Sequence, residues 1–184
     1  MAHALPDPAP GVEPERLLGA WYVLVTNQGF WRDRTHPRVE WDALASDADA
    51  LRVRETRRFR RPDLLGRPQR RLVVGVGVAE APGQFRWRGQ GLRRMLEHST
   101  CVALVDPDYR WAAVWHDGAG VSGPGLAIHT RDPWIPKPKL DAILDQVRGH
   151  PFLGASERDG GARRCDQLFA PRSDWIPPEP YVLT

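Results

Sequence analysis

The sequence lacks the long apolar runs and leader features that would tie it to a membrane. No window approaches the roughly 18–20 consecutive apolar residues that a membrane-spanning helix needs. The opening residues, MAHALPDP, contain neither a basic stretch nor an apolar run, so no secretory signal peptide is expected. We therefore expect no transmembrane segment, and we predict a cytoplasmic location.

Cysteine is also scarce, with only Cys101 and Cys165. Reduced thiols would suit the cytoplasm, although one disulfide between the two stays open. Neither cysteine belongs to a metal-ligand spacing. The sequence has no phosphate-binding glycine loop and no serine-triad motif, and the glycine-containing run at 73–78 lacks the helix of a dinucleotide site. We expect neither a metal nor a cofactor.

The charge is mixed rather than one-sided. Twenty-six basic residues face 23 acidic ones, and the signs are interspersed. The densest basic run lies at 52–61, where Arg52, Arg54, Arg58 and Arg60 share one parity and suggest the solvated face of a strand. A nucleic-acid site would need clustered basic residues with stacking aromatics, so no nucleic-acid partner is predicted.

What the sequence does have is a pattern of short strands. The length suits one domain, and 18 prolines with 17 glycines imply many turns. Apolar and β-branched alternation predicts strands at about 20–27, 38–44, 50–60, 69–79, 84–88, 99–105, 109–116 and 125–130. Apolar residues at helical spacing then predict a helix over 139–148.

These elements favour an all-β fold. An eight-stranded antiparallel up-and-down β-barrel with the helix packed outside removes every strand edge, while a sandwich fits the periodicity almost as well. We expect a loose segment over 1–13, the barrel plus helix over 14–150, and an irregular tail over 151–184 that wraps the barrel.

Three short motifs make the barrel more specific. Gly19 and Trp21 open the first strand, Asp108-Tyr109 opens the seventh, and Arg131 follows the eighth. Their order and spacing resemble the three signatures of the lipocalin family, and in particular the bacterial, apolipoprotein-D-like branch of the calycin superfamily. The resemblance covers about 15–150, although Pro107 replaces the usual residues before the second motif.

The resemblance implies a structural floor for the barrel. It would be formed by Gly19, Trp21, Asp108, Tyr109 and Arg131, with the Arg131 guanidinium over the Trp21 indole. Such a cation–π contact is worth roughly 0.5–2 kcal/mol. The loops at 28–37, 61–68, 89–98 and 117–124 would then surround the open end. Three of them carry apolar residues, which suits the entry of an apolar ligand, although these residues could instead pack on neighbouring loops.

The same register predicts which side chains face inward. The family pattern places alternate residues of the seventh strand inside, and the hydrophobic faces of other strands would join them. The expected ligand-binding residues are Trp111, Ala113, Trp115, Phe85, Trp87, Val74, Val76, Phe59, Val53, Val25, Phe30, Trp31 and Met95. An eight-stranded barrel has room for one small ligand, but these aromatics could also fill it.

The predicted function is binding of a small hydrophobic ligand, such as a lipid, a polyene or an aromatic metabolite. His36, His98 and His116 near the mouth are either solvated or candidate catalytic acids and bases, so an isomerase or cyclase is the alternative. A second alternative is a protein-interaction module with a filled barrel, using Trp175 and Tyr181 of the tail. The sequence leaves the oligomeric state open.

Overall fold

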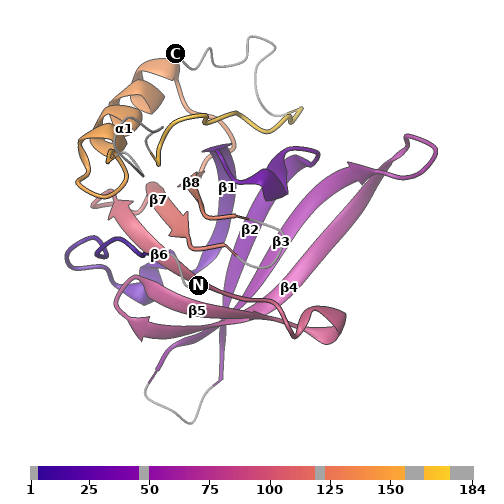
Figure 1. The fold of residues 1–184 in the computed structure, drawn as a ribbon, viewed down its shortest axis with the longest axis horizontal. Helices are drawn as coiled ribbons and strands as arrows, with labels where there is room; N and C mark the ends of the chain where they lie inside the picture. Colours follow the sequence, from indigo (N-terminus) through magenta and orange to yellow (C-terminus); the bar gives the residue numbers. More distant parts are fainter. Residues whose placement is uncertain (1–3, 46–49, 119–122, 156–163, 175–184) are drawn as a thin grey trace.

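Eight antiparallel strands form a closed barrel in the computed structural model, which describes residues 4–45, 50–118, 123–155 and 164–174. Each strand pairs with the next one in sequence, and β8 returns to pair with β1, as Figure 1 shows. The strands are β1 (Gly19–Thr26), β2 (Thr35–Leu44), β3 (Arg52–Pro62), β4 (Pro68–Ala81), β5 (Gln84–Gly89), β6 (Glu97–Val105), β7 (Trp111–His116) and β8 (Gly125–Thr130). The predicted up-and-down barrel is confirmed, and the sandwich is excluded.

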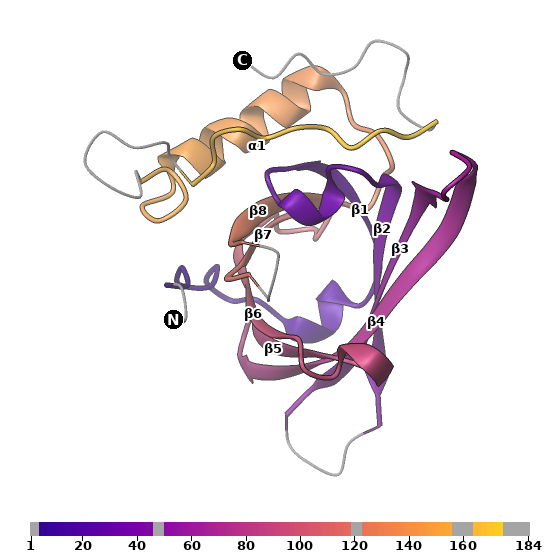
Figure 2. The same ribbon diagram turned by 45° about the vertical axis from the view of Figure 1, so that its right-hand side comes forward.

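One long helix covers part of the barrel wall from outside. The helix α1 (Lys137–Gly149) begins two residues before the predicted start, because Pro138 is tolerated in the first turn of a helix. Three short 3-10 turns, η1 (Pro14–Leu17), η2 (Gly29–Trp31) and η3 (Gly91–Arg93), precede β1, β2 and β6. Figure 2 shows α1 lying across β8 and β1.

The helix gives β7 and β8 two buried faces. Its apolar stripe of Leu140, Ile143, Leu144 and Val147 is buried against strand residues that point out of the barrel. Every residue of β7 and β8 is therefore buried, so hydrophobicity no longer distinguishes the inner face from the outer one.

The prediction that Trp111, Ala113 and Trp115 face the interior was wrong. All three belong to the apolar layer beneath α1, and the Trp115 ring packs edge-on against Phe152 at 5.3 Å. The inward face of β7 consists instead of Ala112, Val114 and His116.

A bulge in β1 changes the facing of a fourth predicted residue. Trp21 and Val23 belong to the interior cluster, but the pairing with β8 shifts between Val23 and Val25. Val25 consequently packs in the layer beneath α1, and its predicted inward position was wrong.

The inward face of β4 carries two glycines. Val73, Gly75 and Gly77 face the interior, whereas Val74 and Val76 face outward, contrary to the prediction. A Cβ atom on Gly75 would lie 2.1 Å from Cε2 of Trp87, so only glycine leaves room for that indole. The larger apolar residues of this strand were therefore a misleading guide to its inner face.

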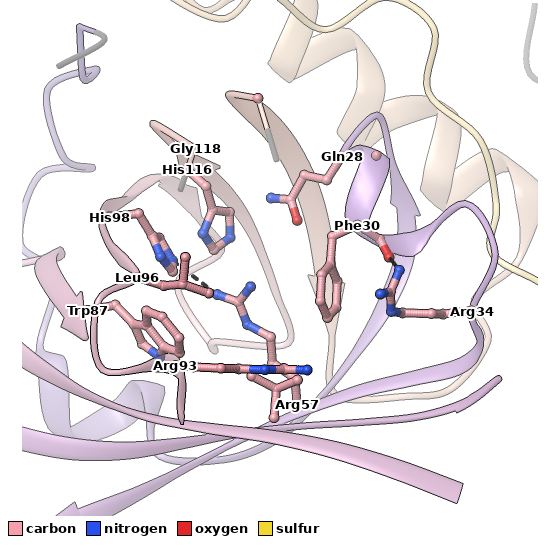
Figure 3. Close-up of a pocket in the computed structure, with 13 residues that line it drawn as sticks. Gln28, Phe30, Arg34, Arg57, Trp87, Arg93, Leu96, His98, His116 and Gly118 are labelled. Atoms are coloured by element: carbon pink, nitrogen blue, oxygen red, sulfur yellow. Dashed lines mark hydrogen bonds between the residues drawn. The ribbon is translucent and has the colours of Figure 1, made fainter. Parts of the chain in front are cut away.

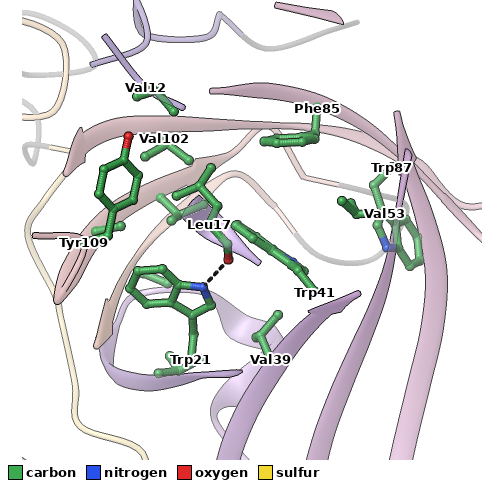
Figure 4. Packing of buried hydrophobic residues seen from close by; sticks show 14 of the residues in the cluster. Val12, Leu17, Trp21, Val39, Trp41, Val53, Phe85, Trp87, Val102 and Tyr109 are labelled. Atoms are coloured by element: carbon green, nitrogen blue, oxygen red, sulfur yellow. Dashed lines mark hydrogen bonds between the residues drawn. The ribbon is translucent and has the colours of Figure 1, made fainter. Parts of the chain in front are cut away.

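The floor of the barrel is closed by an arginine on a tryptophan. The Arg131 guanidinium lies 3.6 Å from the centroid of the Trp21 ring and donates to the carbonyls of Ala20 (2.9 Å) and Arg16 (2.8 Å). The Trp21 indole N–H donates to the carbonyl of Leu17 at 2.7 Å (Figure 4). Gly19 has a φ of +94°, a backbone conformation that favours glycine, which explains the glycine beside the Arg131 guanidinium.

The second motif contributes to the floor through Tyr109 rather than Asp108. The Tyr109 hydroxyl accepts the Glu13 amide at 2.7 Å, while Asp108 is exposed. The carboxylate that orders this turn belongs to Asp106, which accepts the amides of Arg110 (2.6 Å) and Trp111 (3.0 Å).

The lower half of the barrel is solidly packed. Figure 4 shows Trp41 and Val39 beside Trp21, and Phe85 and Val53 belong to the same buried cluster. Phe85 and Val53 face the interior as predicted. They belong to this packed floor, however, and do not line the cavity. An internal ligand must lie above this layer.

The two terminal segments both contact the barrel. The sequence suggested a loose segment over 1–13, whereas Ala9 donates its amide to Val102 at 2.9 Å and Val12 is buried. In the tail, Phe169 exchanges two backbone hydrogen bonds with Thr26, at 2.8 and 2.9 Å. Trp175 and Tyr181 lie outside the described residues.

Cys101 and Cys165 are both buried thiols. Within the described ranges, no helix is long and apolar enough to traverse a lipid bilayer.

We expect Arg131→Met to lower the free energy of unfolding by about 2–3 kcal/mol, because it removes charge-assisted bonds to carbonyls and the contact with Trp21. Arg110→Met is the matched control. Its exposed pair with Asp132 at 2.6 Å should be worth less than about 1 kcal/mol. Urea unfolding followed by circular dichroism measures both, and equal losses would contradict this account of the floor.

Candidate ligand-binding site

A cavity of about 430 Å³ occupies the mouth half of the barrel (Figure 3). Its volume falls within the roughly 300–1,000 Å³ typical of small-molecule sites. It is lined by Gln28, Gly29, Phe30, Arg34, Arg57, Val73, Trp87, Arg93, Leu96, His98, His116, Gly118 and Gly123. The predicted mouth loops at 28–37, 89–98 and 117–124 all contribute, although residues 119–122 lie outside the described part.

The apolar wall comes from four elements. Phe30 follows β1, Val73 lies on β4, Trp87 on β5 and Leu96 precedes β6. The prediction placed Phe30 and Trp87 at the ligand, and both line the cavity. Leu96 takes the position expected of Met95, whose side chain is exposed.

Two other predicted residues support this wall from behind. Trp31 and Phe59 pack edge-on against Phe30, with ring centroids 4.7 and 5.6 Å from it. Trp31 is buried, and its indole N–H donates to the Gln28 side chain at 3.1 Å. Neither residue lines the cavity itself, so both fix the position of Phe30.

An arginine inside the barrel is the feature that the sequence analysis missed. Arg57 shares the inward parity of β3 with Glu55 and Phe59, while its neighbours in the basic run are largely solvated as predicted. Its Nε donates to the buried Glu55 carboxylate, and its Nη2 lies 3.1 Å from Nε2 of His98. The inward parity of Val53 and Phe59 was a signal that could have identified Arg57.

Two of the three candidate histidines lie at the cavity. The His98 ring stacks on Trp87 with centroids 4.6 Å apart, and His116 lies 5.5 Å from His98. His116 also contacts the Thr100 hydroxyl through Nδ1 at 3.1 Å. Burial, reinforced by the Arg57 charge, lowers the pKa of His98 to about 3 and that of His116 well below its ordinary value. Both rings are neutral near pH 7.

The third candidate, His36, lies away from the cavity. Its Nε2 is 2.7 Å from the Asp174 carboxylate, so it ties the tail to β2. A histidine that the sequence analysis did not select, His129, is instead buried in the floor between Trp21 and Trp41, at 6.5 and 6.3 Å. Burial lowers its pKa to about 3.

Among the described residues, no three His, Cys, Asp or Glu side chains come close enough to share a metal ion. The lining offers hydrogen-bond donors and apolar surface.

The buried histidines predict acid sensitivity. In the unfolded chain, histidine takes up a proton below about pH 6.5, whereas His98 and His129 in the native barrel stay neutral down to about pH 3. The unfolded state then binds more protons, so stability falls as the pH drops below 6.5, by up to about 1.4 kcal/mol per pH unit for each histidine. Urea unfolding at pH 7.5, 6.5 and 5 measures this slope. The double variant His98→Gln/His129→Gln should reduce the slope to the part that His116 contributes, and a wild-type profile without a slope would contradict the assignment.

No protein-family model matches the sequence, and no curated protein matches it. Among solved structures, the siderocalin Ex-FABP superimposes with a TM-score of 0.50 and 13% identity, over 86% of this chain and 95% of its own. Apocrustacyanin C1 gives 0.49 and 10% over 76% and 73% of the two chains, and lobster apocrustacyanin A1 gives 0.48 and 11% over 74% and 72%. The superposition on Ex-FABP and the closed eight-stranded barrel with its C-terminal helix show that this chain has the lipocalin fold.

Proposed function

We propose that the barrel binds one small, mainly apolar molecule in the cavity of its mouth half. The observation that carries this proposal is the cavity itself, walled by Phe30, Val73, Trp87 and Leu96 above a filled floor. Burial of a ligand's apolar surface against such a wall supplies the main driving force for binding.

The packed floor limits the ligand. Trp21, Trp41 and Phe85 occupy the space that a long extended chain would need in order to reach the bottom of the barrel. Within the predicted classes of lipid, polyene and aromatic metabolite, we therefore favour a ring-containing or medium-length molecule.

We further propose that the chain is a lipocalin of the apolipoprotein-D-like branch that works in the cytoplasm. The motif residues Gly19, Trp21 and Arg131 meeting at the floor support the lipocalin part. Two buried thiols support the location, and burial raises the pKa of Cys101 to about 12, which makes that thiol unreactive.

Catalysis in the same cavity is the weaker proposal. An isomerase or cyclase would need a proton acceptor with a pKa near the working pH. The pKa of His98 is about 3, and its Nε2 is engaged by Arg57. The filled-barrel interaction module is weaker still, because an open cavity of about 430 Å³ separates the floor from the mouth.

Neighbouring residues of β4 offer a matched test. Val73→Phe projects into the cavity, whereas Val74→Phe adds the same ring to the outer face. With the neutral probe N-phenyl-1-naphthylamine, we expect Val73→Phe to weaken binding by about tenfold, because overpacking a filled site costs about 1–3 kcal/mol. Val74→Phe should leave fluorescence titrations unchanged. Equal effects, or no binding by the wild type to this probe and to a panel of apolar compounds, would contradict the proposal.

A further inference from the structure

We propose that the ligand carries a carboxylate, and that Arg57, His98 and Trp87 receive this group inside the barrel. The inference deepens the proposed function and rests on it. The cavity carries several hydrogen-bond donors, and a purely apolar ligand could not accept hydrogen bonds from them.

The charged groups of the cavity lining are all cationic. Arg34, Arg57 and Arg93 line it, and no aspartate or glutamate of the described residues does so. Arg34 is held by the Phe30 carbonyl and by Asp33 at 2.6 Å, at the rim. The lining therefore attracts an anion and disfavours a cation.

Arg57 is positioned to meet that anion. Glu55 engages its Nε, and the other Glu55 oxygen accepts the Trp41 indole N–H at 2.9 Å. Both oxygens of this carboxylate are thus occupied below the cavity. Figure 3 shows the terminal guanidinium nitrogens of Arg57 directed up toward His98 and His116. A planar guanidinium is well matched to the two oxygens of a carboxylate.

The contact with Arg57 also determines which nitrogen of His98 carries its proton. A guanidinium has no acceptor, so Nε2 of His98 must accept from Nη2 of Arg57. The proton of this neutral ring then resides on Nδ1. Nδ1 is buried and has no hydrogen-bond partner among the described residues.

The Trp87 indole N–H is a second buried donor without an acceptor in the described ranges. The indole is 5% exposed, stacks on His98 and lines the cavity, yet its N–H has no acceptor in the described part of the chain. Buried donors in proteins are almost always satisfied. Other buried donors of the described residues also lack a partner, among them the Trp115 N–H beneath α1. Those of His98 and Trp87 differ because the two rings lie 4.6 Å apart and line the cavity together with Arg57, where the carboxylate of the proposed ligand would complete them.

The apolar wall indicates how the rest of the ligand lies. Phe30 and Leu96 come from the loops at the mouth, and Val73 lies on β4 between β3 and β5. A carboxylate at Arg57 would leave the hydrocarbon part of the ligand against these three side chains. Since the floor is packed, the acid end is the inner end.

The test compares three ligands that share one chain: decanoic acid, 1-decanol and decylamine, each titrated at pH 7.5 by displacement of N-phenyl-1-naphthylamine. For the wild type, we expect the acid to bind about tenfold more tightly than the alcohol, as one charge-assisted hydrogen bond supplies. The amine should bind most weakly.

The key variant is Glu55→Gln/Arg57→Met, because removing Arg57 alone would strand the buried Glu55 charge. We expect this double variant to bind acid and alcohol equally. Trp87→Phe, which keeps a ring and removes the N–H, should weaken acid binding several-fold. Arg58→Met, on the outer face of the same strand, should keep the wild-type preference.

Equal affinities of the wild type for acid and alcohol would overturn the carboxylate proposal while leaving the proposed function intact. So would an acid preference that survives in Glu55→Gln/Arg57→Met, since Arg57 would then serve only to neutralise Glu55. Failure of the wild type to bind any of the three ligands or the probe would instead overturn the proposed function.

Discussion

Closure of the sheet between β1 and β8 is the constraint on which the rest of the structure depends. The pairing of Tyr22 with Thr130 brings Arg131, the next residue, onto the Trp21 indole. That contact seals the floor and fixes one end of the barrel. A bulge in β1 then turns Val25 outward, where it meets α1. The helix packs on this wall because the strands beneath it present apolar residues on their outer face as well as their inner one. The floor leaves the cavity confined to the mouth half of the interior.

The sequence was informative where a local pattern has one structural solution. Strand alternation, the helical spacing at 140–147 and the three motifs predicted the barrel, the helix and the floor. The sequence was misleading where a residue's character is set by a neighbouring element and not by its own strand. Trp111 and Trp115 are apolar because a helix covers them, and Gly75 is inward because an indole needs its space. Neither condition is visible before the strands are assembled.

The candidate site, too, was predictable from the sequence only in part. Parity along β3 could have placed Arg57 inside, and the positions of His98 and His116 near the mouth were anticipated. The pairing of Arg57 with Glu55, the tautomer of His98 and the unsatisfied Trp87 N–H depend on distances between strands. These distances give a pocket whose predicted lining was mainly apolar an apolar wall and a cluster of donors.

The most direct test of this account is the response of the indole N–H resonances to decanoic acid. The eight tryptophans give separate signals in a ¹⁵N-labelled protein, and Trp→Phe variants assign them. The account predicts that the Trp87 resonance moves on titration, because its N–H gains an acceptor, while that of Trp115, buried beneath α1 outside the barrel, stays in place. A shift of Trp115 with Trp87 unmoved would show that the ligand binds elsewhere and would contradict the account.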